Sequence, residues 1–241
     1  MHIINTLNKM RNAALKVFGD IKVFKYPLFI LYDPGSYLLK GEDMRQVINS
    51  IQPGDIIIRG YKNYLDGYFI PGFFSHVGLF LGPISQLDIN NHADESTKSL
   101  IKVGDQMVIH SMAEGVFMED VLNFCRCDYM AILRRKPAAE DLTIANLNWD
   151  EVKKIALSQL GKPYDFEFNF SDYNNLSCTE FVYVCYENIM HFYGIQPKKR
   201  TVMLITKEMI IPDDFINNKF QLVWSNAQMP KKQLEKLLNN N

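Results

Sequence analysis

The sequence lacks several features that would each point to a class of protein. Its 241 residues carry 26 Lys and Arg against 27 Asp and Glu, so it has no basic excess for binding nucleic-acid phosphates. Four cysteines are too few for a secreted scaffold held by disulfides. No apolar run reaches the length of about 18 residues needed to cross a bilayer, and Lys9, Arg11 and Lys16 interrupt any signal-peptide core. We therefore expect a cytoplasmic protein, with peripheral membrane contact and non-classical export left open.

The composition is that of a folded protein, with 47% apolar and 22% charged residues. We divide the chain into three regions. Residues 1–50 are predicted to form an amphipathic helix between Ile3 and Phe18, then an extended, turn-rich segment over 19–42, packed on the main domain. Residues 51–228 form that main domain, and residues 229–241 form a helical tail.

Within the main domain, short apolar runs predict strands, and polar residues 83–106 predict an exposed insertion. Apolar residues at helical spacing predict a helix from Trp149 and another from Ser177 to Phe192. Because strands precede most of the helices, the expected fold class is α+β. The predicted strands cover residues 56–58, 76–82, 107–112 and 129–133.

A capping box marks the start of the last strong helix. Ser177 is followed three residues later by Glu180, just ahead of an apolar helical run. Cys178 is then the first helical residue, where the helix dipole and unpaired N–H groups favour a thiolate. A simpler interpretation competes with a nucleophile, because free cysteine is among the most buried residue types, and Cys185 on the same helix fits that description.

Two histidines could supply the base that such a nucleophile needs. His76 and His110 each lie in an apolar strand, where a single histidine is usually a core residue. If the two strands are antiparallel neighbours, both imidazoles can point from one face. Gly78 lies two residues beyond His76 on that face, and we expect it to leave room for the Cys178 helix.

A metal site is the less favoured interpretation of the same residues. His76, His110 and Cys178 would provide three ligands at most, where zinc takes three or four. Cys125 and Cys127 form a C-x-C rather than the C-x-x-C of common zinc sites, so we expect packing roles for them. The sequence therefore predicts no metal or organic cofactor.

Five short motifs follow one another along the chain in a fixed order. They are Pro53-Gly-Asp-Ile-Ile-Ile58, Ser75-His-Val-Gly-Leu-Phe-Leu-Gly82, Val108-Ile-His-Ser111 with Gly115-Val116, Gly161-Lys-Pro-Tyr-Asp165 and Ser177-Cys-Thr-Glu-Phe-Val182. This series resembles the YiiX/YebB-like branch of the circularly permuted NlpC-type papain-like cysteine hydrolases, and is similar to the lecithin:retinol acyltransferase group. The resemblance runs from about Pro53 to Trp224. It implies a permuted papain-like α+β domain with a small antiparallel sheet packed against the cysteine helix.

The resemblance also implies a role for each site residue. Cys178 would be the nucleophile, His76 the general base and His110 the residue that orients His76. Members of the branch often carry Glu at the third position, whereas His110 matches the acyltransferase group, which leaves the substrate class open. Tyr164 is expected to line the site, and Asp165 to line it or hold a turn.

The implied reaction is cleavage of an amide or ester through a thioester. A peptide or cell-wall peptide substrate is favoured, with an acyl-lipid hydrolase, an acyltransferase and a catalytically silent binding module as alternatives. The aromatic loop from Tyr61 to Phe74 precedes His76 and is expected to wall the site, although packing alone would also explain its aromatic residues. We expect a monomer or small homo-oligomer. The candidate substrate-contacting residues are Tyr61, Phe74, Ser75, Tyr164 and Glu180.

Overall fold

The structure is a computed structural model. It describes residues 21–25, 28–32, 37–62, 70–92, 94–137, 148–168, 170, 172–202 and 205–239. The amphipathic helix predicted between Ile3 and Phe18 lies outside the described residues. No helix among these residues is both long enough and apolar enough to span a membrane.

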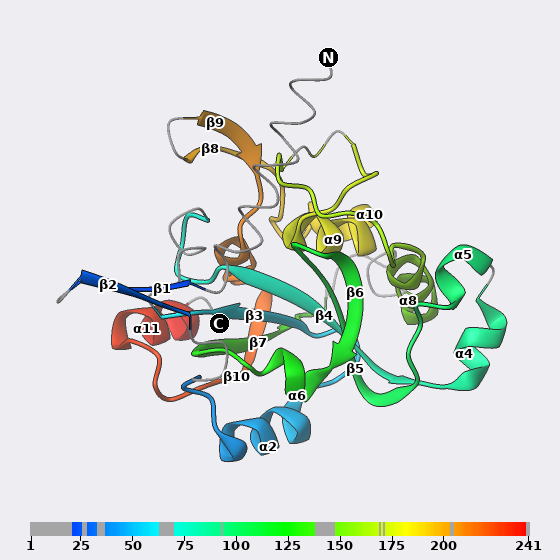
Figure 1. Ribbon diagram of the computed structural model, residues 1–241, viewed down its shortest axis with the longest axis horizontal. Helices are drawn as coiled ribbons and strands as arrows, with labels where there is room; N and C mark the ends of the chain where they lie inside the picture. Colours follow the sequence, from blue (N-terminus) through cyan, green and yellow to red (C-terminus); the bar gives the residue numbers. More distant parts are fainter. Residues whose placement is uncertain are drawn as a thin grey trace.

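A six-stranded antiparallel sheet forms the centre of the molecule (Figure 1). The strand order is β10-β7-β3-β4-β5-β6, so the strands that carry His76 and His110, β4 and β5, are direct neighbours. The apolar run Ile56–Ile58 is buried in its entirety at the middle of this sheet. The strands are β3 (Ile56–Gly60), β4 (His76–Ile84), β5 (Gly104–Met112), β6 (Gly115–Asp120), β7 (Tyr129–Arg135) and β10 (Phe220–Ser225).

Helices cover both faces of the sheet, which is why its central strands are apolar on both sides (Figure 1). One face packs against α8 (Trp149–Ser158), α9 (Cys178–Cys185) and α10 (Glu187–Met190). The other packs against α2 (Gly41–Ser50) and α6 (Val121–Phe124). The described residues also form the helices α4 (Gln86–Asn91), α5 (Glu95–Lys98) and α11 (Lys231–Asn239) and the 3-10 helix η1 (Pro212–Phe215). Two separate hairpins pair β1 (Ile21–Lys25) with β2 (Leu28–Tyr32) and β8 (Lys198–Val202) with β9 (Ile205–Met209).

The element boundaries differ from the sequence predictions in several places. The predicted helix from Ser177 to Phe192 breaks at Tyr186, whose backbone leaves the helical region (φ −125°, ψ 17°) and whose buried hydroxyl donates to the Gly54 carbonyl at 3.1 Å. The insertion over 83–106 contains the short helices α4 and α5, capped by Ser85 and Asp94. Sequence patterns did not reveal α2, β6, α6, the two hairpins or β10. The helix predicted in the C-terminal tail is confirmed as α11.

Candidate active site

The two predicted histidines meet in the structure. His76 Nε2 lies 2.9 Å from His110 Nδ1, and the ring planes are nearly perpendicular, at 81°. Both side chains are buried, His76 to 7% exposure and His110 to 0%. Since β4 and β5 pair antiparallel, the expectation that both imidazoles point from one face is confirmed.

That face is the one covered by α6. The Phe124 ring centroid lies 5.7 Å from that of His76 and 5.0 Å from that of His110. A Cβ on Gly78 would come within 2.7 Å of Phe124 Cε2. The expected reason for Gly78 is therefore wrong: it makes room for a phenylalanine of α6 and not for the helix that carries Cys178.

Two charged residues that sequence reasoning missed lie beside the histidine pair. Arg59 pairs with His76 across β3 and β4, is 3% exposed, and donates from Nη1 to the Phe124 carbonyl at 2.8 Å. Glu119 on β6 places Oε1 at 2.9 Å from His110 Nε2 and 3.9 Å from Arg59 Nη1. In the sequence, Arg59 could have been noticed as a single cation directly after the apolar run Ile56–Ile58. Glu119 was missed because strand β6 was not predicted.

Burial keeps both imidazoles neutral. It lowers the pKa of His76 well below its ordinary value, and the charge of Arg59 lowers it further. Burial likewise lowers the pKa of His110, to about 4, although contact with Glu119 acts in the opposite direction. At neutral pH each ring therefore has one N–H and one lone pair.

Cys178 occupies the position that its sequence predicts, the first residue of α9. The Ser177 hydroxyl accepts from the Glu180 N–H, and the Glu180 carboxyl accepts from the Ser177 N–H at 2.7 Å, so the capping box is confirmed. This box uses two N–H groups of the helix start and leaves those of Cys178 and Thr179 for other partners.

The environment of the sulfur differs from the expected one. Backbone N–H groups of Val77 and Thr179 face it and lower the pKa of the thiol, as a helix start should. Burial outweighs them, since Cys178 is only 2% exposed, and raises the pKa to about 12. The direction of this shift is opposite to the expected one, because burial favours the neutral thiol over the thiolate.

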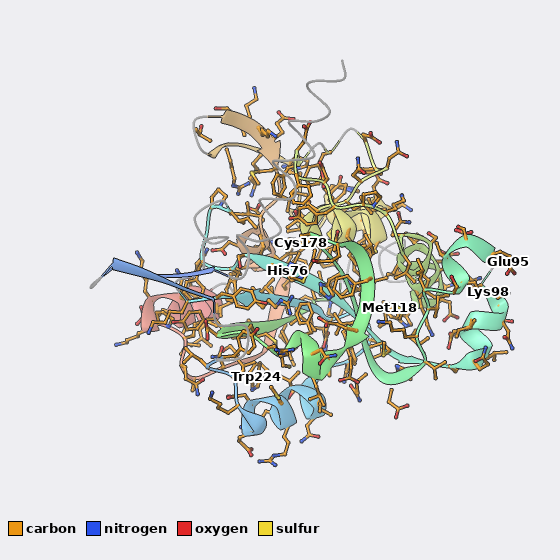
Figure 2. All side chains as sticks on the ribbon, in the orientation of Figure 1. His76, Glu95, Lys98, Met118, Cys178 and Trp224 are labelled. Atoms are coloured by element: carbon orange, nitrogen blue, oxygen red, sulfur yellow. The ribbon has the colours of Figure 1, made fainter. Side chains whose placement is uncertain are left out.

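Cys178 approaches the histidine pair from the opposite side of the sheet. It belongs to the core under α9, together with Val77 and Leu79 of β4. The pairing of β4 with β5 extends only as far as Leu79 and Ile109, so it does not include Val77. The N–H of Val77 instead donates to the Cys178 sulfur. The sulfur therefore lies at the backbone next to His76, at the start of β4, where Figure 2 labels both residues.

Most of the chain matches the model of a known family. Residues 50–238 match the model of a family described as permuted papain-like amidase enzyme, YaeF/YiiX, C92 family. The chain belongs to this family. It is accordingly a thiol-dependent hydrolase with a permuted papain-like α+β fold, as the sequence motifs predicted.

The fold of this C92 hydrolase is also similar to a solved structure. The crystal structure of the metalloprotein yiiX from Escherichia coli O157:H7 matches with a TM-score of 0.50 and 15% identity, over 73% of this chain and 98% of that one. At that identity the likeness shows the fold alone. No curated protein sequence matches the chain.

Within the described part of this C92 hydrolase, no three His, Cys, Asp or Glu side chains are grouped to hold a metal ion. Cys125 and Cys127 are both fully buried in the core beneath α2 and α6, as their predicted packing role requires. Burial raises the pKa of Cys125 to about 12, and raises those of Cys127 and Cys185 as well.

The carboxyl group of Glu180 has a raised pKa. It is fully buried at the start of α9, and burial raises its pKa to about 8, with the Asp165 carboxyl group adding to the effect. Its Oε1 accepts from no N–H or O–H donor among the described residues. A protonated Glu180 resolves this, because its O–H has Asp165 as an acceptor. The position gives Glu180 a capping role, and contact with a substrate stays a prediction.

The other candidate substrate residues are spread around the site. Phe74 is 1% exposed and packs edge-on against Phe73, while the Ser75 N–H donates to the Arg59 carbonyl at 3.1 Å. Tyr61 is half-buried beside the Arg59 guanidinium, 5.7 Å from ring centroid to Cζ. Packing therefore accounts for these loop aromatics, whereas Tyr64, Tyr68 and Phe69 lie outside the described residues.

Tyr164 is half-buried in the loop that leads to α9. Its ring lies 4.8 Å from that of Phe166 and 6.4 Å from that of Phe168, measured between centroids. The loop is tied to the helix start, since the Leu176 N–H donates to the Pro163 carbonyl at 2.9 Å. Phe168 has a φ of +52°, a conformation that costs a bulky residue about 1 kcal/mol.

Proposed function

We propose that this protein hydrolyses an amide bond in a peptide or cell-wall peptide, with Cys178 as nucleophile, His76 as general base and His110 as the group that orients His76. One observation carries the proposal. The sulfur at the start of α9 faces the N–H of Val77, and the residue before Val77 is a histidine hydrogen-bonded to a second buried histidine.

In this proposal the two ring nitrogens of His76 have different roles. Its Nε2 is engaged with His110 Nδ1 at 2.9 Å, so Nδ1 is the atom available to receive a proton from Cys178. As the sulfur attacks the carbonyl carbon, Nδ1 takes the thiol proton and then delivers it to the departing amine while the C–N bond breaks. The resulting thioester is cleaved by water, whose proton passes to His76, and the acid is released with the thiol restored.

The resting charges are those of a neutral thiol and a neutral base, which exchange a proton as the sulfur attacks an electrophile. With the pKa of the thiol raised to about 12 and that of His76 lowered, both groups are neutral before the reaction. The negative charge then develops first on the sulfur and next on the substrate oxygen. In this proposal the Cys178 N–H, which the capping box does not use, donates to that oxygen.

The test is hydrolysis of defined substrates by the full-length protein and two variants. The panel contains short peptides with α- and γ-linked amide bonds, N-acyl amino-acid amides, and phospholipid esters. Cys178→Ala should abolish turnover, because residual catalysis without the nucleophile is lower by about 10⁶-fold. Cys185→Ala is the matched control, since that cysteine is equally buried, at 2% exposure, on the same helix.

Each outcome decides between the candidate functions. Cleavage of a peptide amide that is lost in Cys178→Ala and kept in Cys185→Ala supports the proposal. Cleavage of the phospholipid esters alone would replace it with the acyl-lipid alternative. Turnover that survives in Cys178→Ala, or the absence of Cys178-dependent cleavage across the panel, would contradict it.

A further inference from the structure

We propose that Glu119 is a positioning residue that fixes the proton arrangement of the histidine pair, an inference that rests on the proposed function of His76 and His110. Its carboxylate lies 2.9 Å from His110 Nε2, on the side of the ring opposite His76. The four groups Cys178, His76, His110 and Glu119 would then form one chain along which charge is stabilised.

Strand pairing places Glu119 where this role requires it. On β5 and β6, Val108 pairs with Glu119 and His110 pairs with Phe117. Because side chains alternate along a strand, all four of these residues point to the face covered by α6. The Phe117 ring centroid lies 4.4 Å from that of His110 and limits the movement of the imidazole.

The contact determines which nitrogen of His110 holds the proton. Glu119 Oε1 is close to His110 Nε2 but is not well aligned for a hydrogen bond from it. The buried Nε2 has no other hydrogen-bond partner among the described residues. A lone pair on Nε2 would face the carboxylate at 2.9 Å and be repelled, so the proton is on Nε2. Nδ1 of His110 then accepts from Nε2–H of His76, which leaves the lone pair of His76 on Nδ1.

Glu119 also balances the charge of Arg59. The groups facing its carboxylate are His110 from β5, Arg59 from β3 and Lys102 from the segment before β5. Burial raises the pKa of Glu119, but these three groups together bring it below its ordinary value, so the carboxylate is ionised at neutral pH. Without that charge, Arg59 alone would oppose the positive imidazole that forms when His76 takes the thiol proton.

The first experiment determines which ring nitrogen of His76 and of His110 carries the proton, and it needs no substrate. Nitrogen-15 NMR of the histidine rings in the full-length protein should show His110 protonated at Nε2 and His76 protonated at Nε2. Glu119→Gln should shift the His110 signals toward a mixture of tautomers. Glu114→Gln is the matched control, because it removes the same charge from an exposed position in the turn of the same hairpin, and it should leave the signals unchanged.

The second experiment measures the rate at which iodoacetamide alkylates Cys178 at pH 7. Glu119→Gln should slow it about 10–100-fold, taking as a guide the loss seen when a carboxylate partner behind a metal-bound histidine is removed. Glu119→Asp retains the charge and should recover part of the rate, whereas Glu114→Gln should react like the unchanged protein.

These readouts separate the inference from the proposed function. If no substrate is cleaved but the tautomers and alkylation rates follow the expected pattern, the role of Glu119 stands and the assigned reaction fails. His110 protonated at Nδ1, or a Glu119→Gln variant with unchanged tautomers and an unchanged alkylation rate, would overturn the inference. A variant that loses stability without these changes would show a structural role only, which also overturns it.

Discussion

Replacing Glu180 by Gln should remove a pH-dependent penalty from the folded state. Glu180 is fully buried at the third position of α9, where its Oε2 accepts from the Ser177 N–H at 2.7 Å. Glutamine retains this interaction through its amide oxygen, and its NH₂ replaces the O–H that faces Asp165. The variant therefore preserves the contacts of the protonated acid and lacks its ionisation.

The magnitude follows from the pKa of Glu180, which burial raises from 4.5 to about 8. Between these values the unfolded chain releases the proton and the folded chain keeps it, so the free energy of unfolding falls by about 1.4 kcal/mol per pH unit. This stabilisation is complete below pH 4.5 and is lost as the pH rises through about 8. The loss over that window is roughly 5 kcal/mol, and Glu180→Gln should not show it.

The assay is urea unfolding at several pH values from 5 to 8, the pH range that the raised pKa defines. The stability of Glu180→Gln relative to the unchanged protein should increase steadily with pH. Glu151→Gln is the control, because Glu151 occupies the same third position in α8 but is exposed. Parallel stability curves for Glu180→Gln and the unchanged protein would refute the reasoning, since Glu180 would then ionise normally in the folded state.

Two further substitutions test the packing around the site. Gly78→Ala should lower the free energy of unfolding by about 1–3 kcal/mol, because the added Cβ meets buried Phe124 at 2.7 Å. Gly41→Ala, where a Cβ meets no atom within 4 Å, should cause no loss, and equal losses in the two variants would contradict this account. Asp55→Asn should cost about 3 kcal/mol by urea unfolding, because it removes the charge of a carboxylate only 1% exposed and can accept only one of the two 2.8 Å bonds that Arg134 donates. A loss below about 1 kcal/mol, the value for an exposed ion pair, would show that this one is not effectively buried.

The sequence was most informative where local chemistry decides the structure. The capping box predicted the start of α9 and the place of Cys178 from four consecutive residues. Alternation along β4 and β5 predicted that His76 and His110 share a face. Elements that local patterns mark only weakly were missed. Strand β6 forms a tight hairpin with β5, and its Val116 N–H also donates to the Lys162 carbonyl, far along the chain.

The electrostatics of the site were the least predictable part. The helix start favours a thiolate at Cys178, but burial by residues far along the chain raises the thiol pKa to about 12. Gly78 was assigned to the correct face of the sheet but to the wrong neighbour. A glycine in a strand indicates that another group packs closely against it, but the sequence does not identify that group, which here is Phe124. Arg59 reaches the histidines through the pairing of β3 with β4, and Glu119 through the β5–β6 hairpin, and the sequence patterns identified neither pairing.

The most direct test of the central claim is the order in which the four cysteines react. Limited alkylation of the folded protein, followed by peptide mapping, should find Cys178 modified first, because its sulfur faces the N–H of Val77, the residue next to the proposed base His76. Activity on whichever substrate the panel identifies should fall in step with that modification. Earlier modification of Cys125, Cys127 or Cys185, or full activity in protein whose Cys178 is completely alkylated, would contradict the account.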